Sequence, residues 1–136
     1  GYTQADDLTD FVQGLDYLVT TLPDTPATMG LLDARIFSAM KPGSILINVG
    51  RGNVLDETAL VDAVHCGKIA GAVLDVFKTE PLSPDHLFWT TKGIFITAHT
   101  AAISFPEEIV PVFIQNLQRF LSGAPLKYSV DFNQGY

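Results

Sequence analysis

The sequence predicts an α/β protein built on a parallel β-sheet. Short apolar runs rich in β-branched residues alternate with segments whose apolar residues recur at helical spacing, and Gly or Pro separates them. Strands that alternate with helices form parallel sheets, because a parallel connection must cross the face of the sheet. The chain has 136 residues, of which 47% are hydrophobic, and this is enough for one domain with its own core.

The first elements follow one another as helix, strand, helix and strand. Apolar residues at helical spacing within residues 8–15 predict a short helix. Residues 15–22 form an apolar run that ends at a proline, which is typical of a buried parallel strand. A second helix is expected within residues 32–40, where Lys41-Pro42-Gly43 ends it before the apolar strand at residues 44–49.

The same alternation continues in the second half of the chain. Asp56 can cap a helix that ends at Gly67, and residues 69–76 then read as a third strand. Residues 94–97 predict a fourth, shorter strand. A long apolar stripe predicts a helix over residues 106–122, and the tail that follows is expected to be a return segment.

Composition excludes several classes of function. The formal net charge of -7, without a dense Lys/Arg cluster, argues against binding to nucleic acid or to an anionic membrane. The one cysteine, Cys66, cannot form an internal disulfide, so we expect a cytoplasmic protein. No apolar run approaches the ~20 residues that span a bilayer. Because Gly1 opens the chain without Met, we expect a fragment of a longer protein.

Ligands of open parallel sheets bind beyond the carboxyl ends of the strands. This rule places the chemistry in four loops, at residues 22–28, 50–53, 75–81 and 99–102. None of them contains the GxGxxG pattern that binds a pyrophosphate, because Gly50 and Gly52 lack a third glycine in register.

Arg51 is the first candidate for a substrate-binding residue. It follows an apolar strand and lies between Gly50 and Gly52, so neighbouring side chains leave its guanidinium room to reach over the edge of the sheet. A guanidinium there can bind a carboxylate through two parallel hydrogen bonds. A surface arginine in a glycine turn is the alternative, and the local sequence leaves both open.

His99, Glu80 and Asp75 are the candidates for proton transfer and cofactor contact. His99 follows the fourth strand and is succeeded by small residues, and histidine is the natural proton donor near neutral pH. Glu80 lies in a loop that can fold toward His99, where a carboxylate stabilises the protonated imidazole. The alternatives are a structural histidine, a solvated loop acid and, for Asp75, a turn cap.

Other chemistry-bearing residues are interpreted as structural. His65 and Cys66 have no metal-ligand spacing to His86 or His99, so no metal site is expected. Phe88 and Trp89 are expected to be core or interface aromatics, because no basic residues surround them.

The order of these motifs resembles the D-isomer-specific 2-hydroxyacid dehydrogenase family. The resemblance rests on residues 22–28 (LPDTPAT), 41–43 (KPG), 47–52 (INVGRG), 72–77 (AVLDVF), 80–82 (EPL) and 97–102 (TAHTAA). Residues 84–89 (PDHLFW) are similar to the glyoxylate/hydroxypyruvate reductase branch. The family commonly has proline before the histidine, whereas this chain has Ala98.

The resemblance implies the second half of a Rossmann-type doubly wound parallel sheet with flanking helices. Residues 1–122 would be the carboxy-terminal half of an NAD(P)-binding domain, and residues 123–136 would return toward a substrate domain. The family's glycine-rich loop, the residue that selects NAD or NADP and most of the substrate domain would precede Gly1.

The resemblance also implies hydride transfer between NAD or NADP and a small 2-oxo or 2-hydroxy acid. The catalytic residues would be Arg51 for the substrate carboxylate, His99 as the acid and Glu80 as its partner. The residues expected to bind the cofactor are Leu22, Pro23, Thr28, Val49, Gly50, Arg51, Asp75, His99 and Ala101. A substrate of the phosphoglycerate or formate dehydrogenase type is a further possibility, and formate chemistry needs no proton donor.

One rival function and two consequences follow. Some relatives use the dinucleotide-loaded fold as a protein-binding module, which the sequence does not exclude.

Removing the first half of a doubly wound sheet exposes the edge of the strand at residues 15–22, so we expect a homodimer or another pairing at that edge. We also expect the 136 residues alone to turn over no substrate.

Overall fold

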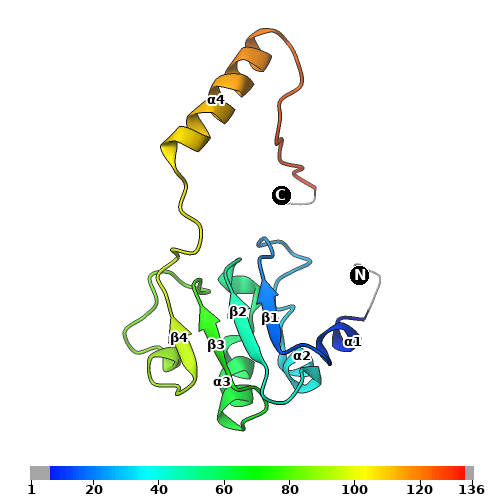
Figure 1. The fold of residues 1–136 in the computed structure, drawn as a ribbon, viewed down its shortest axis with the longest axis vertical. Coiled ribbons are helices and arrows are strands. Elements are labelled where there is room, and N and C mark those ends of the chain that lie inside the picture. Colours follow the sequence, from blue (N-terminus) through cyan, green and yellow to red (C-terminus); the bar gives the residue numbers. More distant parts are fainter. Residues whose placement is uncertain (1–6, 134–136) are drawn as a thin grey trace. The chain divides into compact units, whose positions relative to one another are not determined.

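The structure is a computed structural model, and it describes residues 7–133 (Figure 1). Backbone contacts divide the chain into two compact units, residues 1–99 and residues 100–136, and each is described by itself. Within the described residues, no helix is both long enough and apolar enough to cross a membrane.

The first unit is built on one parallel sheet, as the sequence predicts. Its four strands lie side by side in chain order, namely β1 (Tyr17–Thr20), β2 (Ile45–Asn48), β3 (Gly71–Leu74) and β4 (Ile94–Ile96). The α-helices described in this unit are α1 (Leu8–Val12), α2 (Ala34–Ala39) and α3 (Glu57–His65). Each expected strand and helix forms, although the strands are shorter than the apolar runs that predict them.

Local sequence signals explain where the helices begin and end. Asp33 caps α2 by accepting a hydrogen bond from the Ile36 N–H at 3.0 Å, and Asp56 caps α3 in the same way. Gly67 follows α3 with a φ of 72°, a left-handed conformation that glycine adopts without strain. Two 3₁₀ turns, η1 (Gly52–Val54) and η2 (Leu87–Trp89), were not predicted, because a single turn has no periodic pattern.

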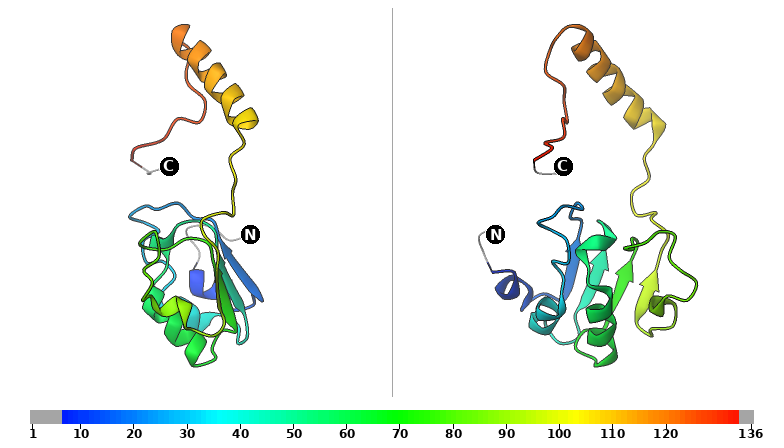
Figure 2. Two further views of the ribbon diagram at one scale, coloured as in Figure 1. Left: turned by 90° about the vertical axis from the view of Figure 1, so that its left-hand side faces the viewer. Right: turned by 180° about the vertical axis from the view of Figure 1, so that it is seen from behind.

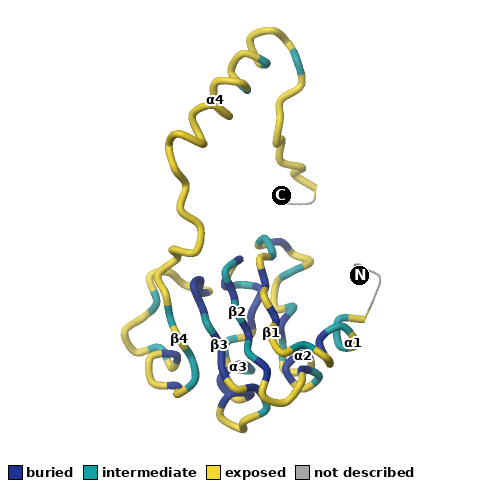
Figure 3. The backbone as a smooth tube through the Cα atoms, in the orientation of Figure 1, coloured by how far each residue is buried: buried dark blue, intermediate teal, exposed yellow. Residues whose placement is uncertain are grey.

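Helices α2 and α3 cover one face of the sheet, and the core lies between them and the strands (Figure 2). On the other face the apolar side chains of Tyr17, Val19 and Phe95 are 62%, 55% and 67% exposed. Exposed residues are yellow along the backbone in Figure 3. The expectation that β1 is a buried strand is therefore wrong for one of its faces. The reason is topological: right-handed crossovers between strands in sequential order place their helices on the same face.

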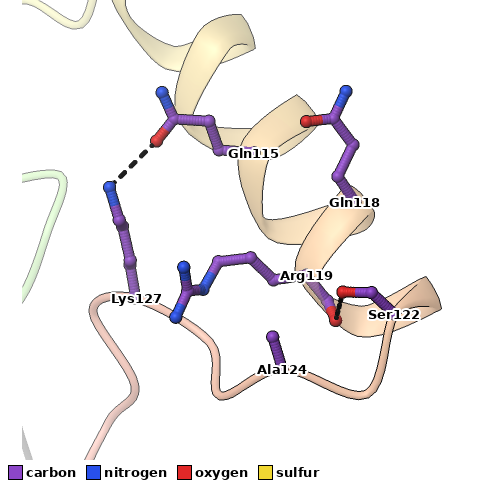
Figure 4. Close-up of a pocket in the computed structure, with 6 residues that line it drawn as sticks. All are labelled: Gln115, Gln118, Arg119, Ser122, Ala124 and Lys127. Carbon is purple, nitrogen blue, oxygen red and sulfur yellow. Dashed lines mark hydrogen bonds between the residues drawn. The ribbon is translucent and has the colours of Figure 1, made fainter.

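The second unit contains α4 (Pro106–Leu121) and the segment that follows it. None of the described residues of α4 is buried, although its apolar stripe predicted the helix correctly. The segment turns back at Gly123, and the Lys127 N–H donates to Asn116 Oδ1 at 2.8 Å. A polar cavity of about 370 Å³ lies between α4 and this segment, with Arg119 and Lys127 on its wall (Figure 4). The side chain of Lys127 donates to Gln115 Oε1 at 3.2 Å.

Candidate active site

The parallel strands all end at one edge of the sheet, and the loops that follow them carry the predicted functional residues (Figure 1). His99 follows β4, and its Nδ1 lies 2.8 Å from Glu80 Oε2. The backbone N–H of His99 donates to the Asp75 carbonyl at 2.8 Å, which ties this loop to the end of β3. The structure therefore brings His99 and Glu80 into direct contact, as the sequence analysis expected.

The backbone of His99 is left-handed, with a φ of 55°. This conformation is uncommon for residues other than glycine, although His, Asn and Asp tolerate it better than most. Such a conformation costs about 1–3 kcal/mol and persists where surrounding contacts hold it. Two contacts hold it here, the amide bond to Asp75 and the side-chain bond to Glu80.

Glu80 accepts two hydrogen bonds that stabilise its ionised form. His99 binds one carboxylate oxygen, and the Phe77 N–H donates to the other at 2.9 Å. The hydrogen bond from His99 and then that from Phe77 hold the pKa of Glu80 below its ordinary value, with a smaller contribution from the charge of Arg51. Glu80 is thus an anion at neutral pH, placed to keep the His99 ring in one orientation.

Arg51 follows β2 and its side chain is exposed, with Nη1 donating to the Gly50 carbonyl at 2.8 Å. A buried residue, Asn48, shapes this turn: its Oδ1 accepts the Gly50 N–H at 3.1 Å and its Nδ2 donates to the Arg51 carbonyl at 3.1 Å. Sequence reasoning missed this role of Asn48. The signal that could have found it is a buried polar residue at the end of an apolar strand, which needs partners for its amide.

Glycines bring three of the loops into backbone contact. A Cβ at Gly50 would lie 2.7 Å from the backbone nitrogen of Leu22, and one at Gly52 would lie 1.9 Å from the carbonyl carbon of Phe77. The loop that holds Arg51 therefore packs against the loop after β1 on one side and against the start of the Glu80 loop on the other. No side chain could occupy either contact.

A cavity of about 530 Å³ adjoins the Glu80–His99 pair. Its lining is mostly apolar, and it comprises Phe77, Glu80, Pro81, Leu82, Trp89, Ile96, Thr97, Ala98 and His99. Trp89 is half exposed and its indole N–H donates to the Ser83 carbonyl at 2.8 Å, whereas Phe88 is buried. Of these two residues, Phe88 is therefore a core aromatic and Trp89 is not. The cavity was not predicted, because its walls come from separate segments.

The loop after β1 contains three residues expected to bind a cofactor, Leu22, Pro23 and Thr28. All three are half-buried. The Thr28 hydroxyl donates to the Pro23 carbonyl at 2.6 Å, so it stabilises the loop itself. A side-chain bond of 2.8 Å from Asn53 Nδ2 to Asp24 Oδ2 then joins this loop to the turn after Arg51.

The remaining predicted residues lie at different places. Asp75 directly follows β3 and is 2% exposed, and its carboxylate accepts a hydrogen bond from the Thr97 hydroxyl. Val49 directly follows β2 and is half-buried, and Ala101 belongs to the second unit. Among residues 7–133, no three His, Cys, Asp or Glu side chains are grouped so that they could hold a metal ion.

The family follows from comparison with known proteins. Residues 1–101 match the model of the D-isomer specific 2-hydroxyacid dehydrogenase NAD binding domain. The chain belongs to this dehydrogenase family. The family assignment agrees with the resemblance drawn from the sequence motifs, and with the parallel sheet that positions His99, Glu80 and Arg51 at one edge.

Curated relatives are similar to nearly the whole length of the chain. The glyoxylate/hydroxypyruvate reductase A of Photorhabdus laumondii is 44% identical over 131 residues, which are 96% of the chain and 42% of the relative. The chain thus spans about two fifths of the length of that curated relative.

Two solved structures also resemble the chain. A D-isomer specific 2-hydroxyacid dehydrogenase from Xanthobacter autotrophicus Py2, in complex with NADPH and MES, is 39% identical with a TM-score of 0.91, over 95% of the chain and 53% of that protein. An NADPH-dependent glyoxylate/hydroxypyruvate reductase from Sinorhizobium meliloti, in complex with NADP and sulfate, is 36% identical with a TM-score of 0.89, over 95% of the chain and 42% of that protein.

Proposed function

We propose that the chain is the carboxy-terminal part of an NAD(P)H-dependent reductase that converts a small 2-oxo acid, of the glyoxylate or hydroxypyruvate type, to the D-2-hydroxy acid. The observation that carries the proposal is the 2.8 Å contact between His99 and Glu80 beside a cavity, with the cation of Arg51 close enough to influence Glu80. These are the groups that carbonyl reduction needs: a proton donor, its ionised partner and a carboxylate anchor.

Each side chain has one step in this reaction. Arg51 binds the substrate carboxylate and polarises the carbonyl, because its guanidinium can donate two parallel hydrogen bonds. His99 donates a proton to the developing alkoxide oxygen. Glu80 accepts from His99 Nδ1, which leaves Nε2 to carry the proton that is transferred, and its negative charge favours the protonated ring.

The loops after the strands fit the nicotinamide end of a dinucleotide. Bound NAD(P)H supplies the hydride. The residues that would hold it are Leu22, Pro23, Thr28, Val49, Gly50, Arg51, Asp75, His99 and Ala101. Gly50 lies against the Leu22 backbone, so the first two loops meet with no side chain between them at this point. A pyrophosphate-binding GxGxxG loop is not among the 136 residues.

The proposal extends to the longer protein. Residues 1–122 would complete the NAD(P)-binding domain and residues 123–136 would lead toward the substrate domain. The family match at residues 1–101 supports the first of these assignments.

We propose a cytoplasmic homodimer. The single cysteine supports the compartment. Within residues 7–133, β1 pairs with β2 only, which leaves an edge for another chain or segment.

The experiment is a steady-state assay of the longer protein that carries this chain. NADH and NADPH would each be tested with glyoxylate, hydroxypyruvate and pyruvate, and we expect turnover of at least one of these 2-oxo acids. The His99→Ala variant is the matched control for background oxidation. Absence of turnover together with tight NAD(P)H binding and altered affinity for a protein partner would instead favour the dinucleotide-sensing module.

A further inference from the structure

Glu57, in the first turn of α3, contacts the loop that carries Glu80 at two residues. Its Oε1 accepts the Lys78 N–H at 3.2 Å, and its Oε2 lies 3.4 Å from His86 Nε2. The side chains of Glu57 and His86 are 19% and 26% exposed, so their contact is partly shielded from water, whereas the contact with the exposed Lys78 is open to solvent. An acidic residue in the first turn of a helix is also favoured by the helix dipole.

The His86 side of this contact is itself fixed to the core. His86 Nδ1 accepts the Phe88 N–H at 3.3 Å, and the two rings meet edge to face with centroids 4.5 Å apart. Phe88 is 1% exposed, so it anchors the far end of the loop in the core. One carboxylate therefore connects α3 to both the beginning and the end of the loop at residues 78–86.

The beginning of the loop is where Glu80 is positioned. Phe77 and Lys78 present successive N–H groups to two different carboxylates: Phe77 donates to Glu80 and Lys78 donates to Glu57. The turn that aims Glu80 at His99 is thus oriented from outside by Glu57. If Lys78 lost its acceptor, the adjoining peptide could rotate and Glu80 could leave His99.

We propose that Glu57 is a positioning residue for the Glu80–His99 pair, acting through the backbone of the loop and not by contact with the substrate. The role in turnover rests on the proposed reductase function, whereas the positioning itself does not. The sequence analysis did not single out Glu57, because its two partners in the loop come close to it only in the folded chain.

The direct test is the titration of the Glu80 carboxylate, followed by NMR of side-chain carboxyl carbons in the 136-residue chain without cofactor. Three substitutions are compared. Glu57→Ala removes the contacts with both Lys78 and His86. Glu57→Asp keeps the charge, but its side chain is too short to make both contacts, and Glu57→Gln keeps an acceptor for the Lys78 N–H. Glu107→Ala is the matched control, because Glu107 is also an acid in the first turn of a helix but is exposed.

The direction in which the pKa of Glu80 changes distinguishes a positioning role of Glu57 from a simple effect of its charge. Losing a nearby negative charge would by itself lower the pKa of Glu80, because a like charge disfavours ionisation. Loss of positioning instead breaks the bond to His99, so we expect Glu57→Ala and Glu57→Asp to raise the pKa of Glu80 toward its ordinary value. Glu57→Gln and the control should not raise it. If Glu57→Ala does not fold, the other two variants still decide the question, because Glu57→Asp is expected to raise the pKa of Glu80 and Glu57→Gln is not.

A second measurement uses the longer protein and an active 2-oxo acid. We expect Glu57→Ala to lower kcat by about 10-fold or more with little change in the KM for NAD(P)H, and Glu57→Gln to recover most of the loss. A Glu80 pKa that stays unchanged or falls in folded Glu57→Ala overturns the proposal. An inactive longer protein overturns the reductase function instead, while the titration still decides the role of Glu57.

Discussion

Replacing Gly52 with Ala tests whether close backbone contact holds the Arg51 loop against the Glu80 loop. The added Cβ would lie 1.9 Å from the Phe77 carbonyl carbon, 2.2 Å from its oxygen and 2.4 Å from the Lys78 nitrogen, whereas ordinary contact begins at 3.4 Å. All three atoms are backbone, so the two loops must separate by about 1.5 Å. Gly52 does not have a left-handed φ, so the substitution adds a steric effect and no backbone strain.

The expected loss of stability is about 3 kcal/mol, the upper part of the range for overpacking, because no flexible side chain can move aside. With a urea dependence of about 2 kcal/mol per molar, the unfolding midpoint falls by about 1.5 M. Unfolding can be followed by the fluorescence of Trp89, the one tryptophan of the chain, which lies in the first unit. In the longer protein, the same displacement should reduce kcat/KM by about 100-fold.

Gly14→Ala is the matched control, since Gly14 is exposed, has open space around its Cα and lacks a left-handed φ. We expect its midpoint to match that of the unmodified chain. A Gly52→Ala midpoint equal to that of Gly14→Ala would show that the two loops are not in the contact described, and the argument that they form one site would fail.

Four further predictions follow from the site. His99→Asn should lower thermal stability only through the loss of the exposed hydrogen bond to Glu80, because Asn tolerates the left-handed backbone, while kcat of the longer protein falls by about 100-fold or more; an unchanged kcat removes His99 from proton transfer. Arg51→Lys should raise the KM for the 2-oxo acid, because a point charge cannot reproduce the forked donor; full kcat/KM would make Arg51 structural. The folded-state pKa of Glu80 lies below its ordinary value of 4.5, so its contribution to stability is fully present above that pH and is lost as the pH falls through the folded pKa. Urea titrations from about pH 6 to about pH 3 should therefore show a shallower decline for Glu80→Gln, and identical slopes would contradict the hydrogen-bonded carboxylate. The 136-residue chain alone should oxidise no NADH with glyoxylate, and any measurable rate would show that it positions the cofactor unaided.

Much of the first unit could be predicted from local patterns. The apolar runs, the capping Asp56 and the glycine after α3 act within a few residues, so they were recognised without knowing the rest of the fold. The turns η1 and η2 could not be predicted, because a single turn produces no repeating pattern. The exposed face of β1 was also missed, since an apolar strand looks the same whether or not a second layer covers it.

The candidate site, too, could be predicted only in part from the sequence. Residue type and position after a strand were enough to select Arg51, Glu80 and His99, and the order of the motifs was enough to indicate the family. The clamp of Asn48 on the Arg51 turn and the two contacts of Glu57 were not predictable, because their partners are chosen by backbone groups that only the folded loops present.

The sequence by itself determined the parallel α/β architecture and the chemical groups at the ends of the strands, because hydrophobic spacing and side-chain chemistry are local properties. The tertiary structure decided that His99 meets Glu80 at 2.8 Å and that Gly52 lies against Phe77. Those contacts join residues separated by crossovers, and their distances depend on how the strands pair and how closely the loop backbones approach.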